Sequence, residues 1–210
     1  METPPTSEGI LRIYLARHGQ TDWNAVRRLQ GSTDIPLNER GREQARALAA
    51  KLARVPLDAI YASGLSRSLE TARIVAQGRE VRSLPELNEQ SMGSFEGKQI
   101  GEAAPVTAAE FERRRADPDD RLDGGESLNQ HLARVEAALA RLRAYHPSGN
   151  ILIIGHGGTN VLLLRALLGL SASQTREIQQ DNSELYLIEI VPGRPALLWK
   201  EVPPDRLGEL

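Results

Sequence analysis

The chain has 210 residues and a formal net charge of −2, from 26 basic and 28 acidic residues, and 40% of its residues are hydrophobic. This length and apolar content are sufficient for one substantial hydrophobic core. The nearly balanced charge gives no overall signal for a nucleic-acid partner. Cysteine is absent, which excludes disulfides, thiolate nucleophiles and cysteine-based zinc sites.

The N-terminal segment, residues 1–9, is polar and contains prolines, without the basic and apolar regions of a signal peptide. No stretch of the chain reaches the roughly 18 consecutive apolar residues that indicate a membrane helix. We therefore expect a flexible N-terminal tail over residues 1–9, no membrane partner and a cytoplasmic location.

Strand-like apolar segments alternate with segments of helical periodicity over residues 10–202, which we take as a single domain. Apolar runs predict strands at residues 10–15, 59–62 and 151–154. Helices are predicted behind two potential N-caps, Asn38 and Ser127, and after Gly157. The apolar stripes that indicate these helices include Ala45, Leu48, Ala49 and Leu52, then Leu128, Leu132, Val135, Leu139 and Leu142, then Leu162 to Leu164.

The C-terminal part predicts two strands, residues 185–191 and 196–202, around a Pro-Gly turn, so the sheet is expected to be mixed and to end in a hairpin. Residues 98–124 are the least regular part, and residues 203–210 are expected to be a loose tail. The predicted fold is an α/β/α sandwich of three layers with a mostly parallel central sheet, a C-terminal hairpin and a small insertion near residues 98–124.

Two histidines follow predicted strands in similar settings. His18 lies between Arg17 and Gly19, and His156 lies between two glycines after the run 151–154. Ligands of open α/β sheets bind outside the carboxyl ends of the strands. Imidazole can act as a nucleophile, and a guanidinium offers a planar fork of donors to phosphate oxygens. A lone histidine is more often structural, but the pair suggests a phosphoryl-transfer site.

Two further elements strengthen this hypothesis. Arg67 follows the strand at 59–62 in what should be the first turn of a helix, where the helix end and the side chain would both attract an anion. The glycine-rich loop 87–97 contains Glu89, and a carboxyl group that is protonated beside anions can be a general acid. Taken alone, each is more simply a solvated side chain.

Taken together, and in their order along the chain, these motifs resemble those of the histidine phosphatase superfamily, also called the phosphoglycerate mutase-like or RHG family. The resemblance covers about residues 10–191. The matching segments are residues 15–21, Asn24, and residues 37–41, 63–72, 89–97, 125–127 and 155–159. The resemblance implies that His18 is the nucleophile that becomes phosphohistidine, and that Arg17, Arg67 and His156 bind the phosphoryl oxygens. It implies that Glu89 protonates the leaving oxygen.

Four other residues are candidates for substrate binding by the same resemblance. Asn24 would donate a hydrogen bond to phosphate, Gln30 and Gly31 fall on the substrate loop, and Gly157 follows the second histidine. The insertion near residues 98–124 corresponds to the family's cap over the pocket. For Ser127 we favour a capping box with Gln130 over a role at the pocket.

The chemistry also sets expectations for protonation and cofactors. His18 must be neutral to attack, whereas His156 helps most as a cation or donor, so we expect their environments to push their pKa values apart and the pH optimum to be acidic to neutral. No metal site and no cofactor are expected. His131 and His146 are interpreted as surface or helix-end residues.

The sequence therefore predicts a metal-independent phosphomonoester hydrolase acting on a small phosphorylated metabolite. A homodimer is expected because dimers are the commonest soluble oligomers. One alternative is a phosphoglycerate mutase, which the short chain and the loop 90–97 disfavour. The other is a non-catalytic phosphate-binding module, which would not need a nucleophile. The run Arg113, Arg114 and Arg115 either contacts a second anionic group of the substrate or, as charge runs usually do, forms a solvated face balanced by Glu110, Glu112 and Asp117.

Overall fold

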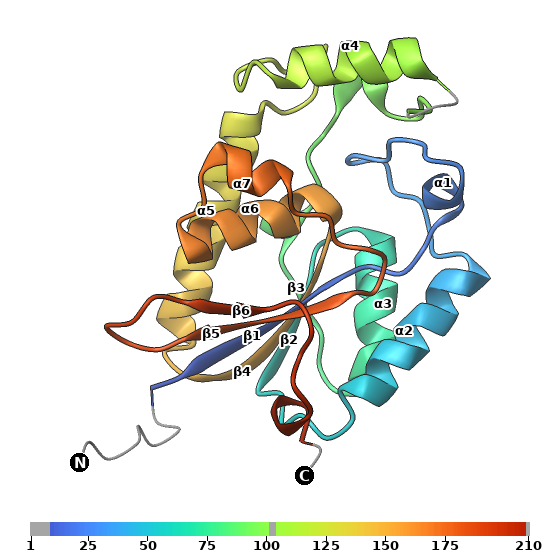
Figure 1. Ribbon diagram of the computed structural model, residues 1–210. Coiled ribbons are helices and arrows are strands. Elements are labelled where there is room, and N and C mark those ends of the chain that lie inside the picture. The colour runs from blue at the N-terminus through green and yellow to red at the C-terminus, as the bar shows by residue number, and fades with distance from the viewer. Residues whose placement is uncertain (1–8, 101–103, 209–210) are drawn as a thin grey trace.

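The computed structural model describes residues 9–100 and 104–208, and a six-stranded sheet lies at its centre (Figure 1). The strands run in the order β3-β2-β4-β1-β5-β6. β4 pairs in parallel with both β1 and β2, whereas β5 is antiparallel to β1 and to β6. The predicted mixed sheet with a C-terminal hairpin is confirmed. The strands are β1 (Leu11–Arg17), β2 (Ala59–Ala62), β3 (Arg82–Ser83), β4 (Gly149–Gly155), β5 (Leu185–Ile190) and β6 (Leu197–Trp199).

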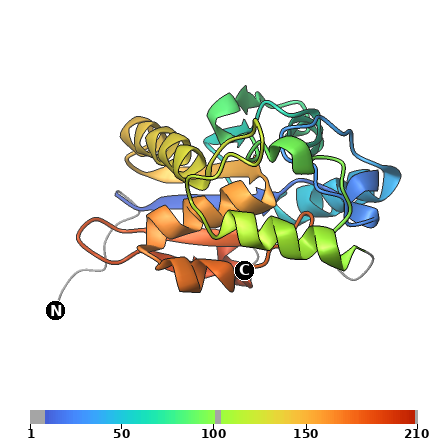
Figure 2. The same cartoon turned by 90° about the horizontal axis from the view of Figure 1, so that it is seen from above.

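Helices cover both faces of the sheet, so the predicted three layers are present (Figures 1 and 2). α2 (Glu39–Lys51) and α3 (Ser66–Ala76) pack on one face, and α5 (Leu128–Tyr145) and α6 (Gly157–Leu168) on the other. The remaining helices are α1 (Asp22–Ala25), α4 (Pro105–Arg115) and α7 (Ala172–Arg176), with 3-10 turns at Pro85–Leu87, Gly93–Phe95 and Pro204–Arg206. Within the described residues, no helix is both long enough and apolar enough to cross a membrane.

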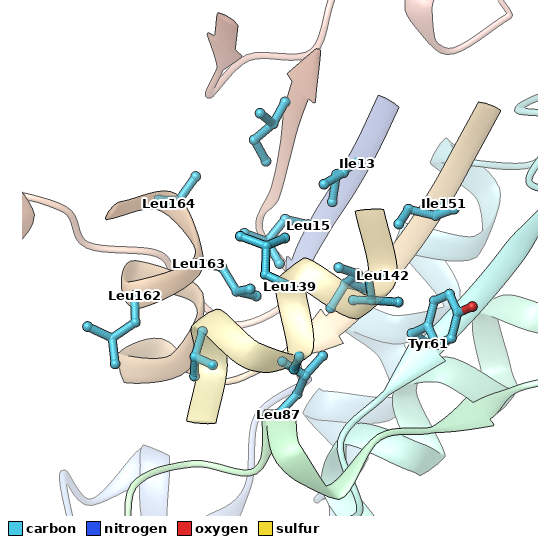
Figure 3. Close-up of a cluster of buried hydrophobic side chains, with 14 of the residues drawn as sticks. Ile13, Leu15, Tyr61, Leu87, Leu139, Leu142, Ile151, Leu162, Leu163 and Leu164 are labelled. Carbon is cyan, nitrogen blue, oxygen red and sulfur yellow. The ribbon is translucent and has the colours of Figure 1, made fainter. Parts of the chain in front are cut away.

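The central strand β1 is buried because its alternate side chains enter two different hydrophobic cores. Leu11, Ile13 and Leu15 pack with residues of α5 and α6, as the close-up in Figure 3 shows for Ile13 and Leu15. Tyr14 and Ala16 point to the opposite face and pack with residues of α2 and α3. Successive side chains of a strand point to opposite faces, so one apolar run supplies both cores.

The predicted helix starts are confirmed. The side chain of Asn38 accepts a hydrogen bond from the backbone N–H of Gly41 at 2.9 Å. Ser127 and Gln130 form the reciprocal pair of a capping box, with bonds of 3.2 and 3.0 Å. These bonds satisfy donors that the first turn of each helix leaves without intrahelical partners.

Three segments differ from the sequence predictions. The insertion near residues 98–124 is more regular than expected, because it contains the helix α4 (Figure 1). The last strand is shorter than the expected 196–202. Residues 203–208 are not a loose tail, because Leu207 is buried in the core and the Tyr14 hydroxyl donates to the carbonyl of Arg206. Residues 1–8 of the expected N-terminal tail, residues 101–103 and residues 209–210 lie outside the described part.

Two glycines set the approach of the loop after β1 to the start of α2. A Cβ on Gly41 would collide with the backbone carbonyl of Gln20, and a Cβ on Gly19 would collide with the carbonyl of Gly41. The same loop is tied to α2 by hydrogen bonds from Asn38 N–H to the Gln20 carbonyl, at 3.0 Å, and from Gln20 N–H to Gln44, at 2.8 Å. Both obstacles are backbone atoms, which cannot rotate away, so this contact fixes the loop that begins at His18.

We therefore expect Gly41→Ala to destabilise the protein by about 1–3 kcal/mol, the usual cost of inserting an atom into a packed contact, and to disturb the loop that carries His18. Urea denaturation measures the first effect. Arg40→Ala, at the neighbouring exposed position, is the control and should change stability by no more than about 0.5 kcal/mol. Equal stability of the two variants would contradict this account of the contact.

Candidate active site

The register of the two central strands brings the two histidines together. Arg17 pairs with Gly155 across β1 and β4, and the backbone N–H of His18 donates to the Gly155 carbonyl at 3.0 Å. The rings of His18 and His156 have centroids 5.1 Å apart, and both residues are at most 2% exposed. Two motifs that are far apart in the sequence therefore form one buried site.

The hydrogen bonds of His18 determine which ring nitrogen can react. Its Nδ1 lies 2.7 Å from the carbonyl oxygen of Gly19. A carbonyl oxygen only accepts, so Nδ1 carries the proton and Nε2 keeps its lone pair in the neutral ring. In this tautomer, Nε2 is the ring nitrogen that could act as a nucleophile.

The second histidine is oriented by a serine that the sequence reasoning did not assign a role. Ser63 Oγ lies 2.7 Å from His156 Nε2 and accepts a hydrogen bond from Leu65 N–H. With the serine hydroxyl donating to Nε2, the proton of the neutral ring is on Nδ1. In the described part of the chain, His156 Nδ1 is buried and has no hydrogen-bond partner. It can therefore donate to a bound oxygen.

The two arginines extend this set of donors. Arg67 lies in the first turn of α3, as predicted, and donates to the carbonyls of Gly31 and Thr33 at 2.8 and 2.9 Å. Arg17 donates to the Gln180 carbonyl at 2.8 Å. The Nε atoms of both arginines are buried and, among the described residues, lack a partner. A buried donor without an acceptor costs free energy, which an anion bound here would offset.

The burial of the site controls the charges of these groups. Burial, followed by the charge of Arg67, holds the pKa of both His18 and His156 well below the ordinary value. The expectation that their pKa values are pushed apart is wrong, because the same burial and the same arginines act on both rings. Burial also lowers the pKa of Arg17 and lowers that of Arg67 to about 10. Because a guanidinium stays protonated in proteins, both arginines are cationic near neutral pH.

Glu89 lies at the N-terminus of α6, where backbone donors surround its carboxylate. It accepts hydrogen bonds from the N–H groups of Gly158, Thr159 and Gln90 at 2.9, 3.2 and 3.0 Å. Burial acts to raise the pKa of Glu89, but His131, the backbone bonds from Gly158 and Gln90, and Arg67 outweigh it, so the pKa is lowered. Without a bound anion, Glu89 is therefore a carboxylate.

His131 is part of this carboxylate's surroundings, which corrects its interpretation as a surface or helix-end residue. It is 1% exposed, and its Nε2 lies 3.0 Å from Thr159 Oγ1, which in turn lies 3.2 Å from Glu89 Oε1. A sequence signal existed, because His131 lies four residues before Val135, on the apolar stripe of its helix. His146 does end that helix, but it is buried and pairs with the Tyr61 hydroxyl at 2.7 Å.

The other candidate residues lie at different distances from the two buried arginines. Gly31 contacts Arg67 through its carbonyl, and a Cβ on Gly157 would lie 3.6 Å from the Arg17 guanidinium carbon. Asn24 and Gln30 instead bond to Thr21, at 3.1 and 3.0 Å. The structure thus brings the two glycines to the arginines and places Asn24 and Gln30 around the cap of α1.

Asn182, which the sequence reasoning missed, connects Asn24 to His18. Its amide donates to the His18 carbonyl at 2.9 Å and to Asn24 Oδ1 at 3.3 Å. Asn182 lies in the segment between α7 and β5, and no motif identifies it. Only the fold places this side chain beside the loop after β1.

A cavity of about 650 Å³ opens beside these groups and is lined by Arg17, Gln90, His131, Gly157 and Gly158 among others. This volume falls in the range of small-molecule sites, about 300–1,000 Å³. Within the described ranges, no group of three or more histidines and acids is arranged to hold a metal ion.

The three consecutive arginines of α4 have separate roles. Arg113 pairs with Glu110 at 2.7 Å on the exposed face, as the solvated interpretation expects, whereas Arg114 pairs with Asp120 at 2.6 Å. Arg115 lines the cavity and is 4.0 Å from Glu112. The run therefore does not act as one unit.

The buried neutral histidines predict a loss of stability in mild acid. Because the folded pKa values of His18 and His156 lie well below the ordinary 6.5, only the unfolded chain binds these protons as the pH falls below that value. The unfolding free energy should fall by about 1.4 kcal/mol per pH unit for each of the two histidines. Urea titrations at about pH 7, 6 and 5 measure this slope, and His18→Asn should reduce it by one histidine's contribution. A slope unchanged in that variant would contradict the assignment.

Comparisons with known proteins agree with this geometry. The sequence profile of the histidine phosphatase superfamily (branch 1) matches residues 13–202. A relative named "Probable phosphoglycerate mutase GpmB", from Enterobacter sp. (strain 638), is 35% identical over 186 residues, which cover 86% of this chain and 85% of the relative.

Solved structures of phosphatases have the same fold. The alpha-ribazole phosphatase from Shigella flexneri is 32% identical with a TM-score of 0.78, and the match covers 90% of this chain and 95% of that one. A mycobacterial glucosyl-3-phosphoglycerate phosphatase, Rv2419c, is 29% identical with a TM-score of 0.79, covering 90% and 97%. Since the family profile spans most of the sequence, this protein belongs to the histidine phosphatase superfamily.

Proposed function

We propose that the protein is a metal-independent phosphomonoester hydrolase that acts on a small phosphorylated metabolite through a phosphohistidine on His18. The observation that carries this proposal is the set of buried side-chain nitrogens without partners, on Arg17, Arg67 and His156, beside a histidine whose Nε2 is free to attack. Such a set matches a phosphoryl group, which brings several anionic oxygens. Family membership and the phosphatase neighbours support an enzyme acting on phosphate esters.

The proposed reaction has two steps. His18 Nε2 forms a bond to phosphorus while the ester P–O bond breaks, and Glu89 gives its proton to the departing oxygen. The Glu89 carboxylate then takes a proton from water as the water oxygen attacks phosphorus, which releases phosphate and neutral His18. Because Glu89 is a carboxylate in the free enzyme, the first step needs the bound phosphate dianion, whose like charge favours protonation of the carboxyl group.

The remaining assignments are part of the same proposal. Residues 10–202 form one catalytic domain, in which the insertion near residues 98–124 is the cap. Gly31 and Gly157 line the phosphate site, whereas Asn24 and Gln30 support it through Thr21. The enzyme needs no cofactor, is cytoplasmic and acts on a metabolite rather than on nucleic acid or a membrane, with a homodimer as the expected assembly.

A phosphoglycerate mutase is the second candidate, because the curated relatives bear that name. Chain length does not separate the two activities, since the match covers 85% of such a relative. Both activities use a phosphohistidine, but a mutase returns the phosphoryl group to a substrate hydroxyl instead of to water.

The test is phosphate release from a panel of phosphorylated metabolites and p-nitrophenyl phosphate in the presence of EDTA. We expect turnover in chelator, and a loss of at least about a thousandfold in His18→Ala, the scale seen when a nucleophile is removed. Acid-labile phosphate should be trapped on the wild-type protein only. Phosphoglycerate isomerisation without phosphate release would establish the mutase, and binding without either reaction would establish a phosphate-binding module.

We also expect His131 to act as a positioning residue for Glu89 through Thr159. Protonation of the leaving oxygen matters for an alkoxide but little for a stable phenolate. His131→Leu should therefore lower kcat about tenfold or more for an alkyl phosphate and change it less than about twofold for p-nitrophenyl phosphate. His146→Asn, which alters the buried histidine at the other end of α5, is the control. Equal losses with both substrates would indicate a general structural defect.

A further inference from the structure

The cavity beside the catalytic groups has a basic wall that the proposed reaction does not use. Three arginines contribute to it, each from a different helix: Arg115 from α4, Arg165 from α6 and Arg176 from α7. Two acids, Glu112 and Asp181, line the same cavity, so the wall keeps an excess of positive charge even before Arg17 is counted. In Figure 1, α4 lies above α6 and α7.

These three arginines differ from the neighbouring arginines of α4 because they lack a close ion pair with a carboxylate. Over the ranges 9–100 and 104–208, Arg165 and Arg176 have no ion-pair partner within 4.0 Å, and the pair of Arg115 with Glu112 is at that limit. Arg113 and Arg114, on the same helix as Arg115, are paired at 2.7 and 2.6 Å. Arginine is abundant in this chain, so it is the shared cavity and the lack of close partners that single out these three.

The cap holds one of the three arginines in place. Phe111 of α4 is buried in a small cluster with Leu29, Phe95 and Leu122, which anchors the helix. The guanidinium carbon of Arg115 lies 5.3 Å from the centroid of the Phe111 ring, a cation–π distance. Arg115 thus lines the cavity with its guanidinium beside a buried ring of the same helix.

Arg17 and the two glycines that follow His156 line the same cavity, so it borders the phosphoryl site. A phosphate ester bound on His18 would extend its leaving group into this space. A planar guanidinium fork binds carboxylate and phosphate oxygens well. Building on the proposed hydrolase, we propose that the leaving group of the substrate carries a second oxyanion, a phosphate or a carboxylate, bound by Arg115, Arg165 and Arg176.

The test compares esters that differ only in the second anion. Hexyl phosphate, hexane-1,6-diol bisphosphate and the phosphate ester of 6-hydroxyhexanoate form one set, and their three-carbon counterparts form another. We expect kcat/KM for at least one compound with a second anion to exceed that of its plain ester by about tenfold, well above the roughly twofold statistical gain of a bisphosphate. The preferred compound identifies the anion as phosphate or carboxylate.

Variants locate the contact. Replacing Arg115, Arg165 or Arg176 by alanine should reduce the kcat/KM ratio of the doubly anionic ester to the plain ester by about three- to fivefold each, the size of a partly exposed charge pair. The hydrolysis of p-nitrophenyl phosphate should not change. Arg113→Ala, at a paired position on the same helix, should leave the advantage intact. No advantage in either set, or an equal loss in Arg113→Ala, would overturn the proposal.

A binding measurement separates this inference from the proposed function. Calorimetric titration of His18→Ala protein with each compound reports the second anion even without turnover. If no compound is hydrolysed by the wild type, the hydrolase fails, but tighter binding of the compound with a second anion, lost in the triple arginine variant, would still support the subsite. Equal binding of the plain and doubly anionic esters would overturn it.

Discussion

The parallel pairing of β1 with β4 is the constraint on which the rest of the site depends. Its register places Arg17 opposite Gly155, so the next residues, His18 and His156, leave the sheet side by side. Because β1 is covered on both faces, the two rings lie at the end of a buried strand pair and are almost inaccessible to solvent. Burial keeps both rings neutral, and a neutral imidazole is the form that attacks phosphorus.

This arrangement has an energetic cost that the proposed substrate would relieve. Two cations and an imidazole donor are held in a low-dielectric site with donors that no described protein group accepts. A phosphoryl group would satisfy those donors and, by its charge, would favour protonation of Glu89 where the free enzyme holds a carboxylate. Substrate binding and protonation of Glu89 would then be coupled electrostatically. The same buried groups that destabilise the free enzyme would stabilise its complex with substrate.

Much of the fold and the centre of the site could be predicted from the sequence, because short-range signals carry them. Apolar runs gave the strands, Asn38 and Ser127 gave helix starts, and the resemblance indicated the residues that meet at the sheet edge. Asn182 and Ser63 were missed as site groups since their partners are distant in the chain. The pKa values of the two histidines were misjudged because burial and charge sum over a three-dimensional neighbourhood that no motif contains.

The three consecutive arginines of α4 show where the limit of sequence-based prediction matters for function. The sequence does not distinguish Arg113, Arg114 and Arg115 from one another. In the helix, however, successive side chains point about 100° apart, and of the three only Arg115 lines the cavity. The strand ends hold the groups that would act on any phosphate ester, whereas α4, α6 and α7 shape the space for what is attached to it. Because α6 begins directly after His156 and carries Arg165 in its last turn, one rigid helix spans both parts. In the proposed enzyme, substitutions of cavity-lining residues on α4, α6 and α7 would therefore alter substrate choice while the sheet keeps the reaction centre intact.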